Sequence, residues 1–320
     1  MLQLRFLAGI LSAGPMVLGA GGVYGQDYPN RPVRIVTAAA GGGSDFVARQ
    51  VAQGISGPLG QPVIVDNRGS GVVQYEFLSK APPDGYGLVV TGSAFYLFPL
   101  LNKVPYDVVN DFSPLSLLVR EVFVVAVHPS LPAKSIKELI TLAKARPGEL
   151  NYASTVAGGP AHLAAELFKS MAGVNIVNVA YKGNAAGNTA LISGEVQLQI
   201  TDSGEIMPHV KSGRMRALAV TSAQPSALVP GLPTVAASGL PGYEMNSMTG
   251  IYAPGKTPAA IINRLNQEIV RALNRADVKE RFLNVGVEVV ASSPEQFAAT
   301  IKSEIAKWGK VMRDAGIKAN

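Results

Sequence analysis

The chain of 320 residues contains no cysteine and only three histidines. The lack of cysteine excludes thiol catalysis, cysteine-ligated zinc, disulfide bonds and a lipid anchor on an N-terminal cysteine. It also suits an oxidising compartment, where an unpaired thiol is a liability. The histidines, His128, His162 and His209, lack the spacing of metal ligands, so we expect neither a metal site nor a cofactor.

Charged residues are scarce as well, at 16% of the chain, and the net charge of +6 includes no run of five or more Lys or Arg. A nucleic-acid-binding protein normally has a clustered basic face, so we expect no nucleic-acid partner. The G-x-S-x-G elbow of hydrolases and the H-E-x-x-H helix of metalloproteases are also missing. We therefore expect no enzyme, and keep an exported hydrolase using Ser44 or Ser154 as the alternative.

Beyond the first 25 residues, no segment approaches the 18 unbroken apolar residues of a membrane span. The segment 1–25 has one cation, Arg5, followed by an apolar stretch that proline and glycine interrupt. Small residues, Val23 and Gly25, precede a plausible cut before Gln26. This pattern predicts a cleaved secretory signal, rather than an N-terminal core helix, and a soluble protein exported to the periplasm.

The rest of the chain alternates apolar strands, glycine- or proline-rich turns and helices. Strands are predicted at 33–39, 61–67, 82–93, 150–154, 175–181, 196–201, 215–222 and 245–255, and helices at 44–56, 76–81, 135–146, 160–172, 184–193, 204–211, 258–275 and from Ser293 onward. Such alternation predicts parallel βαβ units with a ligand crevice at the carboxyl ends of the strands. The extended run 112–130 is too long for one ordinary strand and predicts a strand pair or a hinge strand.

We therefore predict an α/β protein of two Rossmann-like lobes. Residues 26–123 and 221–320 are expected to form lobe 1, and residues 124–220 lobe 2. Two segments cross between the lobes, an arrangement that supports closure on a ligand held in the cleft between them.

The stretch "AAAGGGSDFVAR" at 38–49 places a glycine-rich loop before a helix. Free N–H groups of a first helical turn attract anions, and glycine lets a ligand approach the backbone closely. A nucleotide-binding loop would need Gly-Lys-Ser/Thr, whereas Gly43 is followed by Ser44 and Asp45. We therefore predict that the loop binds a carboxylate; the alternative is that Ser44 or Asp45 only caps the helix.

A second such loop lies in "NYASTVAGGPAHLAAELF" at 151–168. We predict that Ser154, Thr155 and the backbone around Ala157 and Gly158 bind a second polar end of the ligand. His162, in the first helical turn, either hydrogen-bonds the ligand or satisfies a neighbouring carbonyl.

Long segments of the chain resemble one known family. They include "YPNRPVRIV", "AAGGGSDFVAR", "LGQPVIVDNR", "APPDGY", "YASTVAGGPAHLAAELFKSMAG", "VAYKGNAAG", "GRMRALAVTS" and "SPEQFAATIKSEIAKWGKVMRDAGIK". The family is that of the Bordetella-uptake-gene (Bug) proteins, extracytoplasmic receptors of tripartite tricarboxylate transporters, and the resemblance covers the whole mature chain. It implies a type II periplasmic-binding-protein fold, mostly carboxylate ligands, and delivery to large and small membrane subunits. It also implies that Ala40–Asp45 and Ser154–Gly159 contact the ligand.

Some segments depart from the family pattern and bear on the ligand. "GSAFYLFPLL" begins with Ser93 and carries Phe95, whose ring would either stack on an aromatic ligand or fill the lobe core. "QITDSG" carries Asp202 between unusual neighbours. We accordingly expect a monomeric receptor for a mono- or dicarboxylate, aromatic acids included. A sensory receptor that signals to a membrane kinase is a further alternative.

Overall fold

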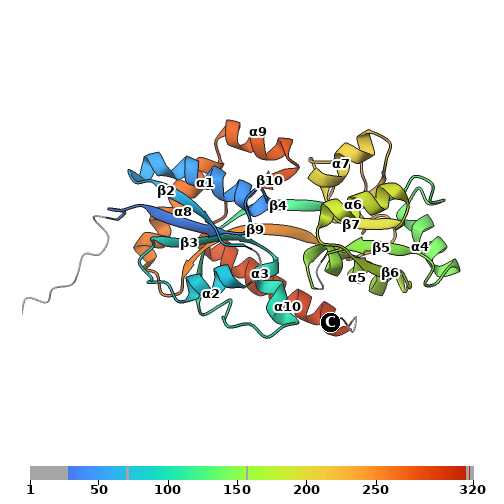
Figure 1. Cartoon of the computed structure of the whole chain (residues 1–320), viewed down its shortest axis with the longest axis horizontal. Coiled ribbons are helices and arrows are strands. Elements are labelled where there is room, and N and C mark those ends of the chain that lie inside the picture. Colours follow the sequence, from blue (N-terminus) through green and yellow to red (C-terminus); the bar gives the residue numbers. More distant parts are fainter. Residues whose placement is uncertain (1–27, 70–71, 156–157, 315–316, 318–320) are drawn as a thin grey trace, which may run out of the picture.

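The computed structural model describes residues 28–69, 72–155, 158–314 and 317. The predicted signal segment 1–25 and the candidate residue Ala157 therefore lie outside the described residues. The described chain forms two α/β lobes side by side, with two strands running from one lobe to the other (Figure 1). None of the helices in these ranges is long and apolar enough to cross a membrane.

The first lobe contains the N-terminal strands and the C-terminal helices. Its strands are β1 (Val33–Thr37), β2 (Val63–Asn67), β3 (Gly87–Gly92), β9 (Asn246–Pro254) and β10 (Val287–Val289). Its helices are α1 (Gly43–Leu59), α2 (Val73–Ser79), α3 (Ala94–Leu97), the 3₁₀ turn η1 (Phe98–Leu100), α8 (Ala259–Leu273), α9 (Ala276–Asn284) and α10 (Pro294–Asp314). Strand β1 pairs in parallel with β2 and β3, as the βαβ pattern predicts, whereas β9 joins β3 antiparallel.

The second lobe repeats this plan on a smaller scale. Its strands are β5 (Asn151–Ser154), β6 (Val177–Ala180), β7 (Leu198–Asp202) and β8 (Arg216–Val220), and its helices α4 (Ile136–Ala145), α5 (Pro160–Ala172), α6 (Asn184–Ser193) and α7 (Ser203–Lys211). Strand β5 pairs in parallel with β6 and β7. Helix α4 begins after the N-cap residue Ser135, whose Oγ accepts a hydrogen bond from the Glu138 N–H at 3.2 Å.

The long extended run is the single strand β4 (Phe112–Val127), which belongs to both lobes. Its pairing with β9 ends at Val122, and its pairing with β7 begins at Phe123. The expectation of a hinge strand is therefore confirmed, and the alternative of a strand pair is wrong. A strand of this length remains stable because most of its side chains are buried in both sheets.

Between β8 and β9 the chain remains against the second lobe. The Tyr243 hydroxyl donates to the carbonyl of Ala164 in α5 at 2.9 Å, and the Met245 N–H donates to the Thr221 carbonyl at 3.0 Å. The return to the first lobe thus takes place in β9, next to β4.

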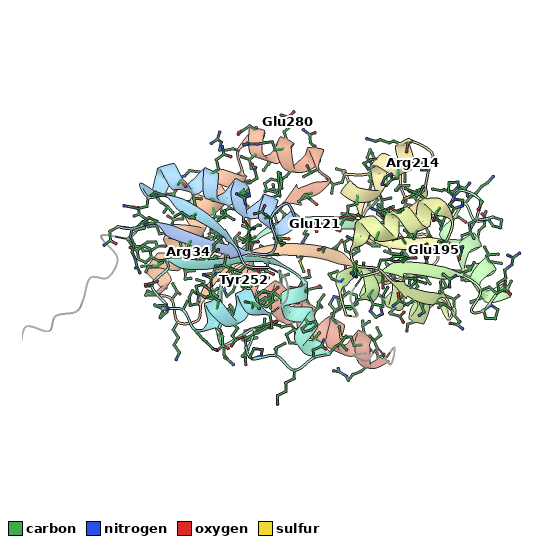
Figure 2. The ribbon with its side chains drawn as sticks, viewed as in Figure 1. Arg34, Glu121, Glu195, Arg214, Tyr252 and Glu280 are labelled. Carbon is green, nitrogen blue, oxygen red and sulfur yellow. The ribbon has the colours of Figure 1, made fainter. Side chains whose placement is uncertain are left out.

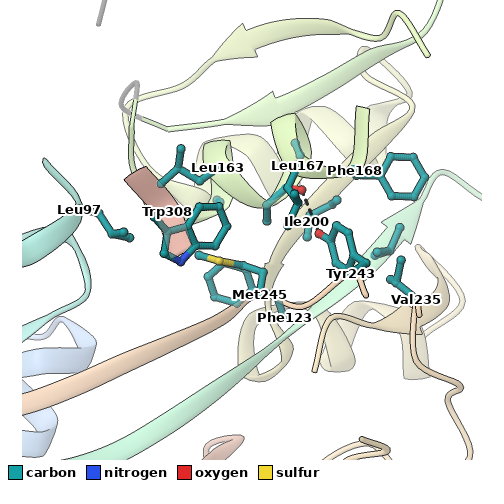
Figure 3. Packing of buried hydrophobic residues seen from close by; sticks show 14 of the residues in the cluster. Leu97, Phe123, Leu163, Leu167, Phe168, Ile200, Val235, Tyr243, Met245 and Trp308 are labelled. Carbon is teal, nitrogen blue, oxygen red and sulfur yellow. Dashed lines mark hydrogen bonds between the residues drawn. The ribbon is translucent and has the colours of Figure 1, made fainter. Parts of the chain in front are cut away.

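One apolar cluster joins the two lobes beside these crossing strands (Figure 3). Trp308 of α10, the single tryptophan of the chain, is fully buried in it. Leu97 of α3 also belongs to the cluster, together with Leu163 of α5 and Met245 at the start of the second crossing. Because buried apolar surface favours keeping these parts together, the cluster holds the lobes in contact on this side.

Besides the short turns α3 and η1, the elements α9 and β10 have no counterpart in the sequence-based prediction. In α9 only Val278 and Phe282 are buried, so the apolar stripe is too short to mark a helix within a charged segment. Strand β10 has three residues and pairs with β4 at Val119–Glu121. Its pairing is with a strand far away in sequence, which no local pattern reveals.

Phe95 lies in the core of the first lobe, and of its two predicted roles the structure supports the packing one. Its side chain is completely buried, and its ring lies 4.7–4.9 Å from those of Tyr75, Phe112 and Tyr252. Stacking on a ligand would need an exposed ring face, which Phe95 does not have.

We predict that Phe95→Ala lowers the free energy of unfolding by about 3–5 kcal/mol, because it removes the centre of an aromatic cluster and leaves a cavity. Urea unfolding monitored by circular dichroism measures this change. Val109→Ala, at a side chain that is 52% exposed, is the control and should change stability little. A cost below about 1 kcal/mol for Phe95→Ala would contradict the packing role.

Candidate ligand cleft

A cavity of about 470 Å³ lies between the lobes, lined by α1, α6, α7, the α9–β10 connection and the strands that cross between the lobes. In Figure 1 these helices lie above the sheets, whereas α3, α5 and α10 of the apolar cluster lie below them. The volume is that of a typical small-molecule site.

One wall of the cavity is the start of α1, formed by Gly41–Ser44. The N-cap residue Gly42 has no side chain to accept a hydrogen bond from the first turn. Among the described hydrogen bonds, the N–H groups of Gly43 and Ser44 have no acceptor in the protein. Free N–H groups at the positive end of a helix form a site for an anion.

Asp45 is occupied by interactions within its own lobe. Its carboxylate accepts hydrogen bonds from the Gly41 N–H at 2.9 Å, from Asn67 Nδ2 at 2.8 Å and from Arg49 Nε at 3.0 Å. Burial alone would raise the pKa of Asp45, but these hydrogen bonds together hold it at about 2. Asp45 therefore fixes the shape of the glycine loop and does not line the cavity.

The opposite wall comes from the second lobe, at the carboxyl end of β7 and the start of α6. Asp202 and Glu205 face the cavity here, together with Asn184. The Asn184 amide lies between the two acids, with Nδ2 3.4 Å from Asp202 Oδ2 and 3.3 Å from Glu205 Oε1.

The floor is built by the crossing strands, with Glu121 from β4 and Ser247 and Thr249 from β9. Burial raises the pKa of Glu121. Burial, and then the charges of Glu121 and Glu205, raise the pKa of Asp202 well above its ordinary value. Burial raises the pKa of Glu205 too, so the cleft contains three carboxyl groups that resist ionisation together.

The second predicted loop does not share this cavity. Ser154 is buried and its hydroxyl donates to Asn178 Oδ1 at 2.6 Å. Gly158 faces Leu101 of the first lobe, and its N–H donates to His162 Nδ1 at 3.2 Å. Thr155 is half-buried and also outside the lining. Of the described residues of this loop, none lines the cavity, because α5 begins on the side of the apolar cluster.

Of the remaining candidates, Gly43, Ser44 and Asp202 lie together in the cavity, and Ala40 and Ser93 do not line it. Ala40 is exposed beside the loop. Ser93 is buried, where its Oγ accepts hydrogen bonds from the Met248 N–H and the Tyr96 hydroxyl, each at 2.9 Å.

The sequence-based interpretation missed several lining residues. They include Glu121, Asn184, Glu205, Ser247, Thr249 and the segment 285–287. Asn184 and Glu205 follow strands of the second lobe, so their position after a strand was an available signal. Glu121 lies inside a long strand, where only the three-dimensional arrangement places it beside a ligand.

Two α/β lobes that share a cavity beside two crossing strands are the arrangement found in periplasmic solute-binding proteins. The family model of the tripartite tricarboxylate transporter family receptor (TctC) matches residues 47–317, and the chain belongs to this family. It is a family of solute-binding receptors rather than of enzymes.

Individual relatives agree with this assignment and confirm the predicted fold. Protein BugT of Bordetella pertussis is 35% identical over 92% of this chain and 93% of its own length. The structure of R. palustris Rpa4515 with adipate is 35% identical, with a TM-score of 0.81 over 91% of this chain and 99% of that chain. MatC from Rhodopseudomonas palustris with bound malate is 27% identical, with a TM-score of 0.76 over 89% of this chain and 99% of its own.

The carboxyl group of Glu121 predicts a pH dependence of stability. Because its pKa is raised in the folded protein, ionising it costs stability as the pH rises from about 4.5, the value in an unfolded chain, through the folded value. Glu121→Gln removes this cost, so we expect a higher melting temperature than wild type at about pH 8, by roughly 2–4 °C for each kcal/mol regained.

Thermal denaturation between about pH 4 and pH 8 measures the effect, and the difference should shrink toward the acidic end. Glu288→Gln, on the exposed face of the neighbouring strand β10, is the matched control. An equal shift at both ends of the pH range would contradict the prediction.

Proposed function

We propose that this protein is a periplasmic receptor that captures a small carboxylate and delivers it to the membrane subunits of a tripartite transporter. The family membership supports the receptor role, and of the two related structures one is with adipate and the other with bound malate. Export to the periplasm rests on the signal pattern of residues 1–25, and we propose that the receptor acts as a monomer.

The observation that carries the carboxylate proposal is the start of α1. The N–H groups of Gly43 and Ser44 open into the shared cavity with no acceptor in the described protein. Hydrogen bonds to a charged group contribute about 1.5–3 kcal/mol each. A carboxylate placed there satisfies both donors and the positive end of the helix.

We propose that recognition depends on movement of the lobes about β4 and β9. The change of partner at Val122 and Phe123 supports the first predicted boundary, between residues 123 and 124. The contacts of Tyr243 and Met245 with the second lobe favour moving the second boundary from residue 221 to the start of β9. A ligand that bridges the lobes would stabilise the closed arrangement.

An exported hydrolase is less well supported by the same geometry. Ser154 is buried and donates to an amide oxygen, which is no general base. Ser44 lines the cavity, but no histidine is among the described lining residues. Because Phe95 is buried, it gives no support to the prediction of an aromatic ligand. Among the described lining residues, the aromatic ring is that of Phe46.

Gly43→Pro tests the carboxylate proposal, because it removes one N–H while the helix stays intact. Proline suits the first helical position, and Gly42 has the extended backbone (φ −82°, ψ 169°) that a following proline requires. We expect carboxylate affinity, measured by calorimetry over a panel of small acids, to fall by about tenfold or more.

Gly43→Ala is the matched variant, since it adds a methyl group and keeps the N–H. Its Cβ would lie 3.8 Å from Glu121 Oε1, an ordinary contact distance. The difference between the two variants isolates the N–H. Equal affinities for the acids in both would refute the role of α1, and turnover of an ester or amide would favour the hydrolase.

Gly204→Ala tests lobe closure. At the cleft edge, Ser203 Oγ donates to the Gly286 carbonyl at 3.3 Å, and a Cβ on Gly204 would overlap the Val285 carbonyl oxygen. We expect the variant to hold the lobes further apart, which raises the radius of gyration in small-angle X-ray scattering and weakens ligand binding roughly tenfold.

Gly57→Ala is the control for this variant, because a Cβ on Gly57 meets no atom within 4 Å and lies inside helix α1. It should leave the scattering curve and the affinity unchanged and keep or raise stability. If Gly204→Ala behaves in the same way as Gly57→Ala, the contact between the lobes plays no part in closure.

A further inference from the structure

Two carboxyl groups meet where the lobes join. Glu121 lies in β4 between the two lobes (Figure 2), next to the point where that strand changes partner. Asp202 is the last residue of β7 in the second lobe, and in the sheet register it lies opposite Phe123, two residues along β4 from Glu121. Both side chains line the cavity. The pair therefore spans the boundary between the lobes.

Glu121 and Asp202 hydrogen-bond each other, and such a bond needs a proton. Ionised carboxylates are acceptors only, so two of them have no donor to share. Asp202 Oδ1 is buried, and no other group of the described protein donates to it. A proton held between the two carboxyl groups supplies this donor, and their removal from water favours the protonated form.

The described lining of the cavity adds a third acid to this pair and includes no Lys, Arg or His. The third acid is Glu205 of α7, whose charge raises the pKa of Asp202 further. Within this lining, a proton is therefore the group that relieves the repulsion among the acids.

Charged groups on the same elements lie outside the described lining. They include Asp45 and Arg49 on α1, Arg120 on β4, Lys182 before α6, His209 on α7 and Glu288 on β10. Asp45 is paired with Arg49 at 3.0 Å, and His209 Nδ1 lies 2.8 Å from the Arg214 guanidinium. Arg120 and Glu288 are opposite each other in the register, on the face of the strands turned away from Glu121.

The anion site at the start of α1 lies next to the pair. A methyl group on Gly43 would lie 3.8 Å from Glu121 Oε1, and the free N–H groups of Gly43 and Ser44 open into the same cavity. A carboxylate bound there places a negative charge close to Glu121, in a cleft where charges are poorly screened. That charge disfavours ionised Glu121 and favours the protonated pair.

We propose that binding of a carboxylate at the start of α1 is coupled to the uptake of one proton from solvent by the Glu121–Asp202 pair. The inference rests on the proposed function, because it assigns the carboxylate to α1. By linkage, the acid binds more tightly as the pH falls, and the bound acid makes the pair harder to ionise. The shared proton also favours closed lobes, because closure keeps the two carboxyl groups together.

Calorimetry on the full mature chain tests this coupling with hexanoate, benzoate, adipate and malate. Each titration is run in phosphate and in Tris at the same pH, and the difference in heat counts the protons exchanged, because the two buffers differ widely in ionisation enthalpy. The probes ionise near the pKa of Asp and Glu, so they are charged from about pH 6 upward. For the acid that binds most tightly, we expect uptake of roughly 0.2–1 proton at about pH 7. We also expect its Kd to rise roughly threefold or more between about pH 6 and about pH 8.5.

Amide variants then locate the proton. Glu121→Gln and Asp202→Asn each replace one carboxyl group by an amide, which can donate to the remaining acid and does not titrate. We expect both variants to bind the acid at about pH 8.5 as tightly as wild type does at about pH 6, with proton uptake near zero. Glu280→Gln, at an exposed acid of α9 outside the cavity (Figure 2), makes the same change in net charge and should keep the pH dependence of wild type. Melting curves establish that each variant is folded.

The outcomes distinguish this inference from the proposed function. If an acid binds without proton uptake, or equally tightly at both pH values, the coupling is refuted and the carboxylate receptor stands. If the two amide variants take up as many protons as wild type, the Glu121–Asp202 pair is refuted as the acceptor. If none of the four acids binds to the folded protein, the carboxylate proposal is overturned, and the coupling with it.

Discussion

The pairing of the single strand β4 first with β9 and then with β7 is the constraint on which the rest of the molecule depends. Because β4 exchanges β9 for β7 between Val122 and Phe123, one strand is shared by two sheets, and each lobe closes its own core around one end of it. The buried cluster around Trp308 fixes the lobes to each other on one side of these strands. The cavity is left on the other side, where the elements that face each other are loop ends and helix starts.

The sequence predicts this architecture well because most of it depends on local patterns. Helix α5 (Pro160–Ala172) and helix α6 (Asn184–Ser193) begin and end where glycine, proline and apolar spacing indicate. The start of α1 could be predicted as a carboxylate site for a physical reason. A glycine-rich loop without a lysine still leaves free backbone N–H groups in the first turn of the helix. The exact boundary between the lobes depends instead on contacts between distant parts of the chain. Tyr243, for example, packs on α5 and so keeps the segment before β9 with the second lobe.

The candidate site was harder to predict, because its polar groups come from positions with no shared local signature. Ser154 ends β5 and His162 lies in the first turn of α5, as Gly43 and Ser44 lie in the first turn of α1, yet α5 begins beside Leu101 and the apolar cluster. The wall opposite α1 is formed instead by the next strand of that sheet, β7, and by the starts of α6 and α7. The rule that ligands bind at the carboxyl ends of strands identifies several candidate loops. Only the twist and the order of the strands decide which of these loops face each other across a cavity.

Glu121 connects recognition with the hinge. It pairs with Ser247 of β9 and Val287 of β10, one residue before β4 changes partner. Glu121 of the hinge strand and Asp202 of the second lobe hydrogen-bond each other, and burial raises the pKa of both. Moving the lobes apart would expose these two carboxyl groups to water and favour their ionisation, whereas keeping the lobes together favours the shared proton. The protonation of this pair is therefore coupled to the equilibrium between open and closed lobes.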